Sequence, residues 1–443
     1  MNNFTPFVSN KVFLKSLVLF CLITINLVAF AQKSSSHSPY SEFGIGQMRG
    51  DYTPQMRAMG NVSTGLRYLG GMPLLNVSNP ASYSALQRTV FEAAMYGNIT
   101  QLSKGAVTDN TADFSFGQII MGVPLSAKAG GFAFGLLPFS DVGYSSSEIR
   151  VMDTIQYRQS ISGEGGLNKA FIGYGISPVK GLSVGANAGF VFGHLSDISS
   201  IDFPAHLRAY SSVLNEKREI RGATIDYGAQ YFKSLGKNTH ITIGYSGSLN
   251  NTLTNTSSQL LTRTDPFSNV GYSELIAIDT ISLSTSPSRE INLPLKHNVG
   301  VSVAKGYNWM VGADFKYADW SYFQTRKNEQ AMGKDYGFSI GGQMKPDPTS
   351  TRYLNQVDYR IGFRYNKLPY THKGQDINDV AVSLGFGFPL PETNFGQTFS
   401  YVNISAEAGQ LGSLQNSLVR ERYINLNFSL SINDTWFRKR RHD

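Results

Sequence analysis

The stretch that decides the fold is Tyr-Ile-Asn-Leu-Asn-Phe-Ser-Leu-Ser-Ile-Asn, residues 423–433, close to the end of the chain. Apolar side chains occupy every second position, and polar ones fill the positions between them. Because successive side chains of a strand point to opposite faces, this segment predicts a strand with one apolar and one polar face. By itself, the pattern fits a lipid-facing strand and the half-buried edge of a soluble sandwich equally well.

The residues after this strand favour a membrane setting. Trp436 and Phe437 follow at the place where the interfacial aromatic girdle of an outer-membrane barrel would sit, and we interpret the pair as the C-terminal barrel signal. Residues 438–443 form a basic tail that cannot remain in hydrocarbon. The end of the chain therefore predicts a final barrel strand whose tail lies in water.

The start of the chain predicts export. Lys11 and Lys15 precede an apolar stretch that ends in the small-x-small sequence 29–31, so residues 1–31 are expected to be a secretory signal peptide. The single cysteine, Cys21, lies inside this signal, and cleavage would leave a mature chain without disulfides, cysteine zinc sites or a cysteine nucleophile. A lipoprotein anchored at Cys21 is the alternative, which the large residue before Cys21 disfavours.

Composition narrows the class of protein. The chain has 44 Gly, 28 Phe and 23 Tyr, and only 16% of its residues are charged, against roughly 25% in soluble domains. No segment after the signal reaches the roughly 20 apolar residues of a spanning helix. The net charge is +8, but its basic residues are scattered and the chain is exported, so we expect no nucleic-acid partner. These features predict a β-barrel in contact with lipid in the outer membrane of a Gram-negative-type bacterium.

Alternating runs organise the rest of the chain. Residues 32–88 lack sustained alternation, whereas residues 89–437 contain about 14 to 16 alternating runs, which predicts an all-β, transmembrane, antiparallel barrel. The polar stretches 196–215, 255–272 and 322–335 are expected to be long extracellular loops.

The phase of the runs assigns charged residues to the lumen. A charge at the lipid midplane would cost about 2–4 kcal/mol, so the charged face of each strand must point inward. We expect a charge-balanced polar network in the lumen, made of Asp226, Asp314, Lys316, Asp358, Arg360 and Arg364. An acid/base pair of Asp314 and Asp358 is the alternative.

The sequence carries no familiar catalytic motif. The seven His residues show no spacing that suits a metal site, and neither a nucleophile elbow nor a phosphate-binding loop is present. We therefore expect a protein that is not an enzyme and that has neither a metal site nor a cofactor.

Several short motifs carry a family resemblance. Arg57-Ala58-Met59-Gly60, followed by Asn79-Pro80-Ala81, resembles the N-terminal signature of the FadL/TodX family of outer-membrane transport proteins. Further segments look like a diverged branch of that family, namely 137–144, 163–168, 319–321, 385–390 and 434–437. The resemblance covers essentially the whole mature chain.

The resemblance implies a barrel of about 14 strands whose N-terminal segment, within residues 32–88, folds into the lumen as a hatch. The hatch residues would be Arg57, Gly60, Asn79, Pro80 and Ala81. Members of the family move hydrophobic compounds passively, and the ligand leaves by a lateral opening or around the hatch. One departure is that 70–75 replaces the acidic residues usual before Asn-Pro-Ala.

Arg57 needs a partner in this arrangement. A buried guanidinium is costly unless a carboxylate compensates it, and Asp226, Asp314 or Asp358 would supply one.

Two functions follow. The first is an outer-membrane channel for passive uptake of small hydrophobic compounds of the fatty-acid or aromatic-hydrocarbon type, with such a compound as ligand. The alternative is a non-transporting barrel that serves as a subunit or scaffold of an outer-membrane protein secretion or assembly machine, with an outer-membrane or periplasmic protein as partner.

Overall fold

The structure is a computed structural model of the chain. It describes residues 38–126, 128–203, 209–236, 238–264, 277–325, 332–372, 374–391, 398–414 and 418–435. The expected signal peptide, the Trp436–Phe437 pair and the basic tail lie outside these residues. Within the described ranges, no helix is long and apolar enough to cross a membrane.

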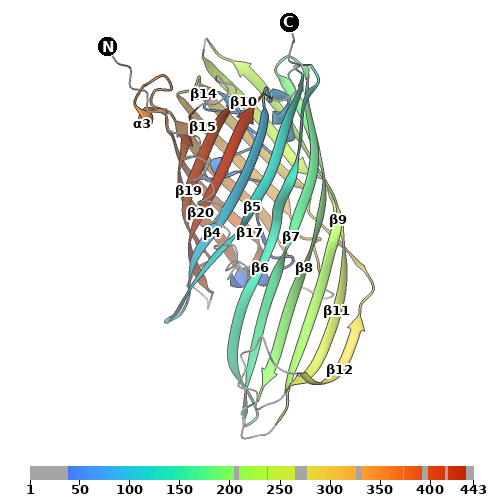
Figure 1. The fold of residues 1–443 in the computed structure, drawn as a ribbon. Coiled ribbons are helices and arrows are strands. Elements are labelled where there is room, and N and C mark those ends of the chain that lie inside the picture. The colour runs from blue at the N-terminus through green and yellow to red at the C-terminus, as the bar shows by residue number, and fades with distance from the viewer. Residues whose placement is uncertain are drawn as a thin grey trace, which may run out of the picture.

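The described chain forms a closed antiparallel barrel of 14 strand positions, which confirms the predicted barrel (Figure 1). The ring closes where β20 pairs with β4, from Asp434 opposite Thr89 to Arg420 opposite Ser103. The wall strands are β4 (Thr89–Lys104), β5 (Val107–Ser126), β6 (Gly130–Met152), β7 (Ile155–Val179), β8 (Leu182–Asp202), β9 (Ser211–Ser234), β10 (Thr239–Ser248), β11 (Thr252–Thr264), β12 (Ala277–Thr285), β13 (Arg289–Asn292), β14 (Lys296–Lys305), β15 (Trp309–Asp319), β16 (Lys334–Met344), β17 (Asp358–His372), β18 (Gln375–Pro389), β19 (Phe399–Leu411) and β20 (Arg420–Asp434).

Two positions of the ring are shared by successive strands. β10 and β11 follow each other along β9, and β14, β13 and β12 follow each other along β10 and β11. A short helix, α3 (Tyr353–Gln356), lies in the connection between β16 and β17. Because the strands close into a ring, most backbone groups of the wall find partners within the wall, as a lipid environment requires, and the exception between β5 and β6 is described below.

Alternation along the strands sorts side chains between lipid and lumen. On β17, Ile361 is 59% exposed, whereas Arg360 is 5% exposed. On β20, Ile424, Phe428 and Leu430 are exposed, while the polar residues between them are mostly buried. The apolar face of the last strand therefore points outward and its polar face points into the lumen.

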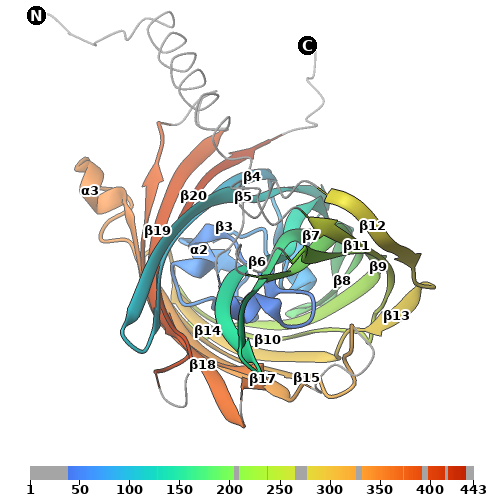
Figure 2. The ribbon, with the colours of Figure 1, turned by 90° about the horizontal axis from the view of Figure 1, so that it is seen from below.

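Residues 38–86 occupy the lumen and are called the luminal segment below (Figure 2). They contain η1 (Pro39–Glu42), β1 (Gln47–Met48), α2 (Pro54–Arg57), the β2–β3 hairpin (Tyr68–Leu69 and Met72–Pro73) and η2 (Pro80–Ala85). Most of their side chains are buried. Pro opens both 3-10 helices and α2, where its missing N–H costs no hydrogen bond.

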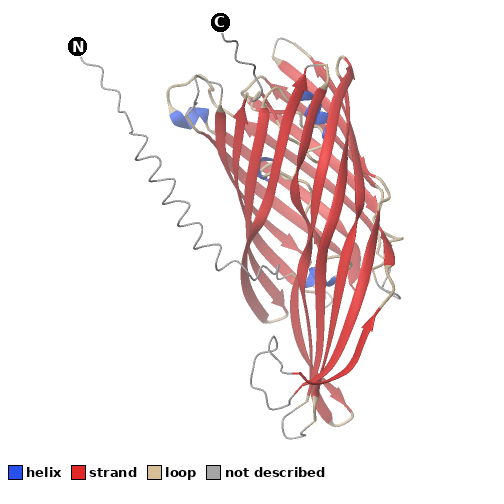
Figure 3. Cartoon of the chain, turned by 45° about the vertical axis from the view of Figure 1, so that its right-hand side comes forward, coloured by secondary structure: helices blue, strands red, loops and turns tan. Residues whose placement is uncertain are grey.

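The two ends of the barrel differ. The chain enters β4 and leaves β20 at one end, which also carries the short turns 180–181, 235–238 and 306–308, and we call it the turn end. At the opposite end, β6 to β9, together with β11 and β12, extend past the rest of the barrel (Figures 1 and 3). This extension is called the wing, and its end of the barrel the wing end.

The wing corrects the expectation of long loops. β6 to β9 have 23, 25, 21 and 24 residues, whereas a spanning strand needs about 9–11. The stretches 196–215 and 255–272 were expected to be loops, yet β8 runs to Asp202, β9 begins at Ser211 and β11 runs to Thr264. For these two stretches the prediction was wrong, because strands outside lipid can carry polar side chains on both faces. Of the third stretch, the described residues 322–325 and 332–333 lie in the connection between β15 and β16.

The wall is interrupted between β5 and β6. These strands pair only from Ile119 opposite Leu136 to Ser126 opposite Gly130. Toward the wing end, β6 continues along β7 alone, apart from two residues of β1 that pair with Ser140 and Asp141. At Ser140 and Asp141, the strand that pairs with β6 on this side is therefore β1 of the luminal segment.

Candidate functional site in the barrel lumen

Asn79 fixes the last turn of the luminal segment. Its side-chain oxygen accepts a hydrogen bond from the N–H of Ala81 at 3.2 Å and caps η2. Its amide nitrogen donates to the carbonyl oxygen of Thr64 at 2.8 Å and to those of Ala229 and Tyr245 at 3.4 Å. This predicted hatch residue thus joins two parts of the luminal segment to the barrel wall.

Close backbone contacts hold the segment at Pro80 and Gly60. Pro80 lies against two wall glycines, Gly175 and Gly185, and a side chain at either would clash with it. Gly60 has a φ of 69°, which favours glycine, and its N–H donates to the hydroxyl of Ser383 at 2.9 Å. Its Cα approaches the backbone of Phe363 so closely that no Cβ would fit. Glycine is needed at all three positions for space, and at Gly60 for conformation as well.

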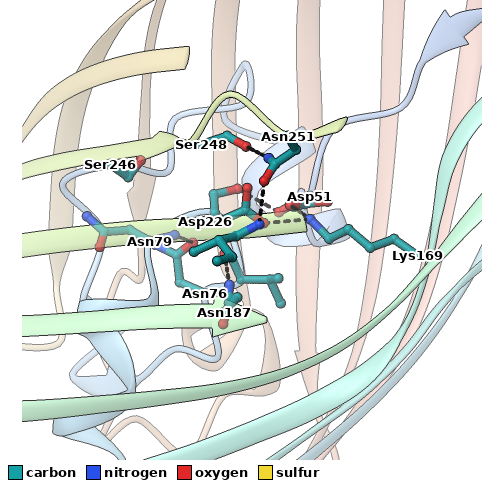
Figure 4. Close-up of polar contacts among 12 residues, drawn as sticks. Asp51, Asn76, Asn79, Lys169, Asn187, Asp226, Ser246, Ser248 and Asn251 are labelled. Carbon is teal, nitrogen blue, oxygen red and sulfur yellow. Dashed lines mark hydrogen bonds and ion pairs between the residues drawn. The ribbon is translucent and has the colours of Figure 1, made fainter. Parts of the chain in front are cut away.

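A buried ion-pair group joins the middle of the segment to two strands (Figure 4). The Lys169 ammonium on β7 lies 2.6 Å from the Asp51 carboxylate and 3.0 Å from that of Asp226 on β9. The Lys169 side chain is 4% exposed. Because all three groups are largely removed from water, each charge depends on the others.

Asp314 and Lys316 also bind the segment, through its backbone. One carboxylate oxygen of Asp314 accepts hydrogen bonds from the N–H groups of Ser63 at 2.7 Å and Thr64 at 2.8 Å. The Lys316 ammonium donates to the Asn61 carbonyl at 2.9 Å. Asp314 and Lys316 therefore both satisfy main-chain groups of the luminal segment.

The predicted polar residues of β17 belong to two separate groups. Asp358 pairs with Arg360 at 3.1 Å and with Lys345 at 3.2 Å. Arg364 pairs at 3.0 Å with both Asp379 and Glu407. The six predicted lumen residues therefore belong to several separate groups. Each of them contacts the neighbouring wall strand or the adjacent backbone of the luminal segment.

Arg57 corrects an expectation. Its guanidinium donates to the carbonyl oxygen of Arg49 at 3.2 Å and lies over the Tyr52 ring. The carboxylates proposed as its partners are engaged elsewhere, Asp226 by Lys169 and Asp314 by backbone amides. The local fold of the luminal segment supplies a main-chain oxygen and an aromatic face in place of a wall carboxylate.

The start of the luminal segment is fixed at the wing-end mouth. The Ser38 hydroxyl donates to the Glu421 carboxylate at 2.7 Å, and the Tyr40 hydroxyl donates to the carbonyl oxygen of Val419 at 2.5 Å. Burial, with the nearby Glu421 carboxylate, raises the pKa of Tyr40 to about 12. The Phe43 ring stacks on Tyr370 at 4.9 Å between centroids. The segment is thus fixed to β17, β20 and the loop before β20.

A cavity of about 320 Å³ remains between the segment and the wall. It is lined by apolar residues such as Phe139 and Trp320, and also by Lys169, Lys316 and Arg364. Among the described residues, no group of three or more His, Cys, Asp or Glu could hold a metal ion. The arrangement is suited to fixing the luminal segment, and its chemistry is that of ion pairs and main-chain hydrogen bonds.

Sequence reasoning missed several partners in this site. Lys169 lies on the same face of β7 as Leu167 and Phe171, so alternation gave no clear polar face there. Asp379 could have been found, because it continues the polar face of the alternating run that starts at Val380. Asp51 carried no signal, since it lies in a segment without periodicity.

The family model BamG matches residues 13–443, nearly the whole chain. The chain belongs to the BamG family. Among curated proteins, none matches the chain.

Solved structures share the fold of this BamG-family chain at low sequence identity. The Pseudomonas putida toluene transporter TodX is 16% identical, with a TM-score of 0.55 over 89% of this chain and 100% of that one. The Ralstonia pickettii toluene transporter TbuX is 13% identical, with a TM-score of 0.55 over 86% and 98%. A Pseudomonas aeruginosa FadL homologue is 12% identical, with a TM-score of 0.54 over 88% and 100%. The predicted resemblance to FadL/TodX proteins is therefore confirmed for the fold.

Proposed function

We propose that this protein is a non-transporting barrel subunit of an outer-membrane protein assembly machinery. Membership of the BamG family points to this role. In this proposal the turn end faces the periplasm and the wing end faces the cell exterior, because bacterial barrels carry their longer projecting segments on the extracellular side.

The observation that carries the proposal is the fixation of the luminal segment at both mouths and at mid-height. Near the wing end, Ser38 bonds to Glu421; in the middle, Asp51 pairs with Lys169; further along, the Arg67 guanidinium donates to the Ser183 hydroxyl at 2.5 Å. A path through the lumen would require several of these contacts to break together. A segment held in this way suits a scaffold.

The charges of the central cavity support the same conclusion. A hydrocarbon crossing the lumen would pass Lys169, Lys316 and Arg364 and would displace water from ionised groups, which is unfavourable without compensation. Sites for hydrophobic ligands are lined mainly by apolar side chains.

A passive channel for small hydrophobic compounds is the second candidate, and the interruption between β5 and β6 favours it. Residues 107–118 of β5, on the wing-end side of Ile119, do not pair with β6. Phe114 and Phe116 on this part of β5 face outward and are exposed. A hydrophobic solute entering at the wing end would leave sideways through this interruption. Toluene transporters share the fold, which keeps this function testable.

One set of strains separates the two functions: wild type, a strain without the gene, and a strain whose protein lacks residues 41–85. The scaffold role predicts equal uptake of labelled fatty acid and of toluene in all three. It also predicts that loss of the gene lowers the amount of other heat-modifiable barrels in the outer membrane. Reduced uptake without the gene, together with normal barrel amounts, would instead establish the channel.

Purified protein in planar bilayers gives a second measurement. Wild-type protein is expected to conduct no ions, and protein without residues 41–85 is expected to insert and conduct, since the lumen then lacks its filling. Equal conductance of the two proteins would contradict a filled lumen.

A further inference from the structure

A second cavity, of about 350 Å³, lies at the turn end, away from the charged central cavity. It is enclosed by the β2–β3 hairpin of the luminal segment and by β9, β10 and β14 to β16. Buried Thr242, Ser302 and Met310 line it, and exposed Tyr307, at 55%, lines it from the turn between β14 and β15. We call this cavity the turn-end pocket.

The turn-end pocket is aromatic and uncharged. No Lys, Arg, Asp or Glu of the described residues lines it. The Phe232 ring stacks on His240 at 5.1 Å and tilts against Tyr68 at 5.6 Å, which gives a continuous aromatic wall. The Arg67 guanidinium lies 5.7 Å from the Phe232 ring and 5.9 Å from the Tyr68 ring, although Arg67 does not line the pocket. The aromatic surface therefore favours a neutral ligand with a flat apolar face, because a cation would meet Arg67 and any charged ligand would lose its hydration without a partner.

The rings are not part of a lipid-facing girdle. Phe232 shares its face of β9 with buried Gln230, and His240 shares its face of β10 with buried Thr242. Both rings therefore point into the lumen, and anchoring in the membrane interface does not explain why aromatic residues occupy these positions.

A polar group in the pocket has no partner. The Nδ1 atom of His240 is enclosed and makes no hydrogen bond to the described residues. Because this atom is not itself exposed in the pocket, a ligand reaches it only after the His240 ring turns. A hydrogen-bonding group on the ligand would then recover about 1–3 kcal/mol, the cost of a buried polar atom without a partner. The volume is more than twice the ~150 Å³ of a cavity that binds benzene, so a substituted ring would fit.

We propose that the turn-end pocket binds a neutral aromatic ring that carries a hydrogen-bonding group, presented from the periplasm as a Tyr or Trp side chain of a partner protein. This inference rests on the proposed role as a machine subunit, for which such side chains are the usual interface anchors. Free aromatic compounds share the ring chemistry. A site for a side chain predicts that N-acetyl-tyrosinamide, which carries the two amide groups of a polypeptide, binds at least as tightly as p-cresol, and weaker binding would assign the pocket to free compounds.

The test measures binding of small probes to the purified full-length protein in micelles by saturation-transfer NMR and calorimetry. N-acetyl-tyrosinamide and p-cresol are expected to bind, whereas N-acetyl-lysinamide is not. Toluene, which lacks the hydrogen-bonding group, is expected to bind about 2- to 10-fold more weakly than p-cresol, the range that one neutral hydrogen bond provides. Equal binding of toluene would assign the pocket to plain hydrocarbons and overturn the proposal.

Variants locate the site. Ala304→Trp fills the pocket from β14 and is expected to weaken p-cresol binding at least 10-fold, whereas Asn298→Leu, on the same face of the same strand but lining the central cavity, leaves it unchanged. His240→Leu is expected to remove the preference for p-cresol over toluene. If Ala304→Trp does not fold, judged by heat-modifiable gel migration, Tyr307→Ala at the exposed rim replaces it.

Unchanged binding in the pocket variants overturns the proposal. Such a failure is distinct from failure of the machinery role, because the amounts of other barrels in cells do not depend on probe binding.

Discussion

The ion-pair group of Lys169 provides the sharpest test of how the luminal segment is held. Lys169→Met removes the ammonium that pairs with Asp51 and Asp226 and leaves both carboxylates without it. Removing one partner of a buried pair costs about 3–5 kcal/mol. Asp51 and Asp226 keep 21% and 19% of their side chains exposed, so water relieves part of the loss and the lower end of this range applies.

Hydrogen exchange of peptides from residues 50–65, measured by mass spectrometry on purified protein, reports opening of the luminal segment. A cost of about 3 kcal/mol raises the exchange rate roughly 100-fold, since each 1.36 kcal/mol is a factor of ten. The triple variant Lys169→Met, Asp51→Asn, Asp226→Asn removes the orphaned charges and is expected to recover most of the protection.

The matched control is Lys217→Met, because Lys217 forms an exposed pair with Glu219 on β9. Exposed pairs contribute about 0–1 kcal/mol, so exchange should stay close to wild type. Our reasoning is refuted if Lys169→Met exchanges like the control, or if the triple variant exchanges as fast as the single one.

Three further changes test the lumen, the lipid face and the orientation. Asp314→Asn weakens the acceptor of two luminal N–H groups and should speed their exchange, at a cost of about 1–3 kcal/mol; unchanged exchange would mean that these bonds do not hold the segment. Ile361→Arg places a charge toward lipid and should destabilise the barrel by up to about 2–4 kcal/mol in urea titrations. The control Leu354→Arg, at a residue that is 67% exposed next to the turn end, should not destabilise it. Equal stability of the two variants would contradict the assigned faces. An epitope inserted before Ser38 should bind antibody on intact cells, and one after Ser350 only on permeabilised cells; the reverse result would invert the barrel.

The sequence predicted the side-chain directions in the barrel wall well, and it predicted the wing and the contacts of the luminal segment less well. Alternation in 423–433 assigned the outward Ile424 and the inward Asn427 correctly, because a strand fixes side-chain direction locally. The sequence predicted that some strands extend past the membrane but not that 196–202, 211–215 and 255–264 belong to such strands, since alternation is lost where both faces of a strand meet water. The hatch role of the luminal segment stays a prediction, although Asn79 and Gly60 contact the wall.

The sequence by itself determined which side chains must avoid lipid, because the cost of a charge in hydrocarbon depends on the residue and on period two alone. Only the tertiary structure decided what those side chains meet inside. Lys169 finds Asp51, 118 residues away, and Arg57 finds a main-chain oxygen, because ring closure brings distant strands around one enclosed segment. The tertiary structure also decided two further features, the interruption between β5 and β6 and the turn-end pocket. Both depend on how the strands pair around the ring and on how the luminal segment packs inside it.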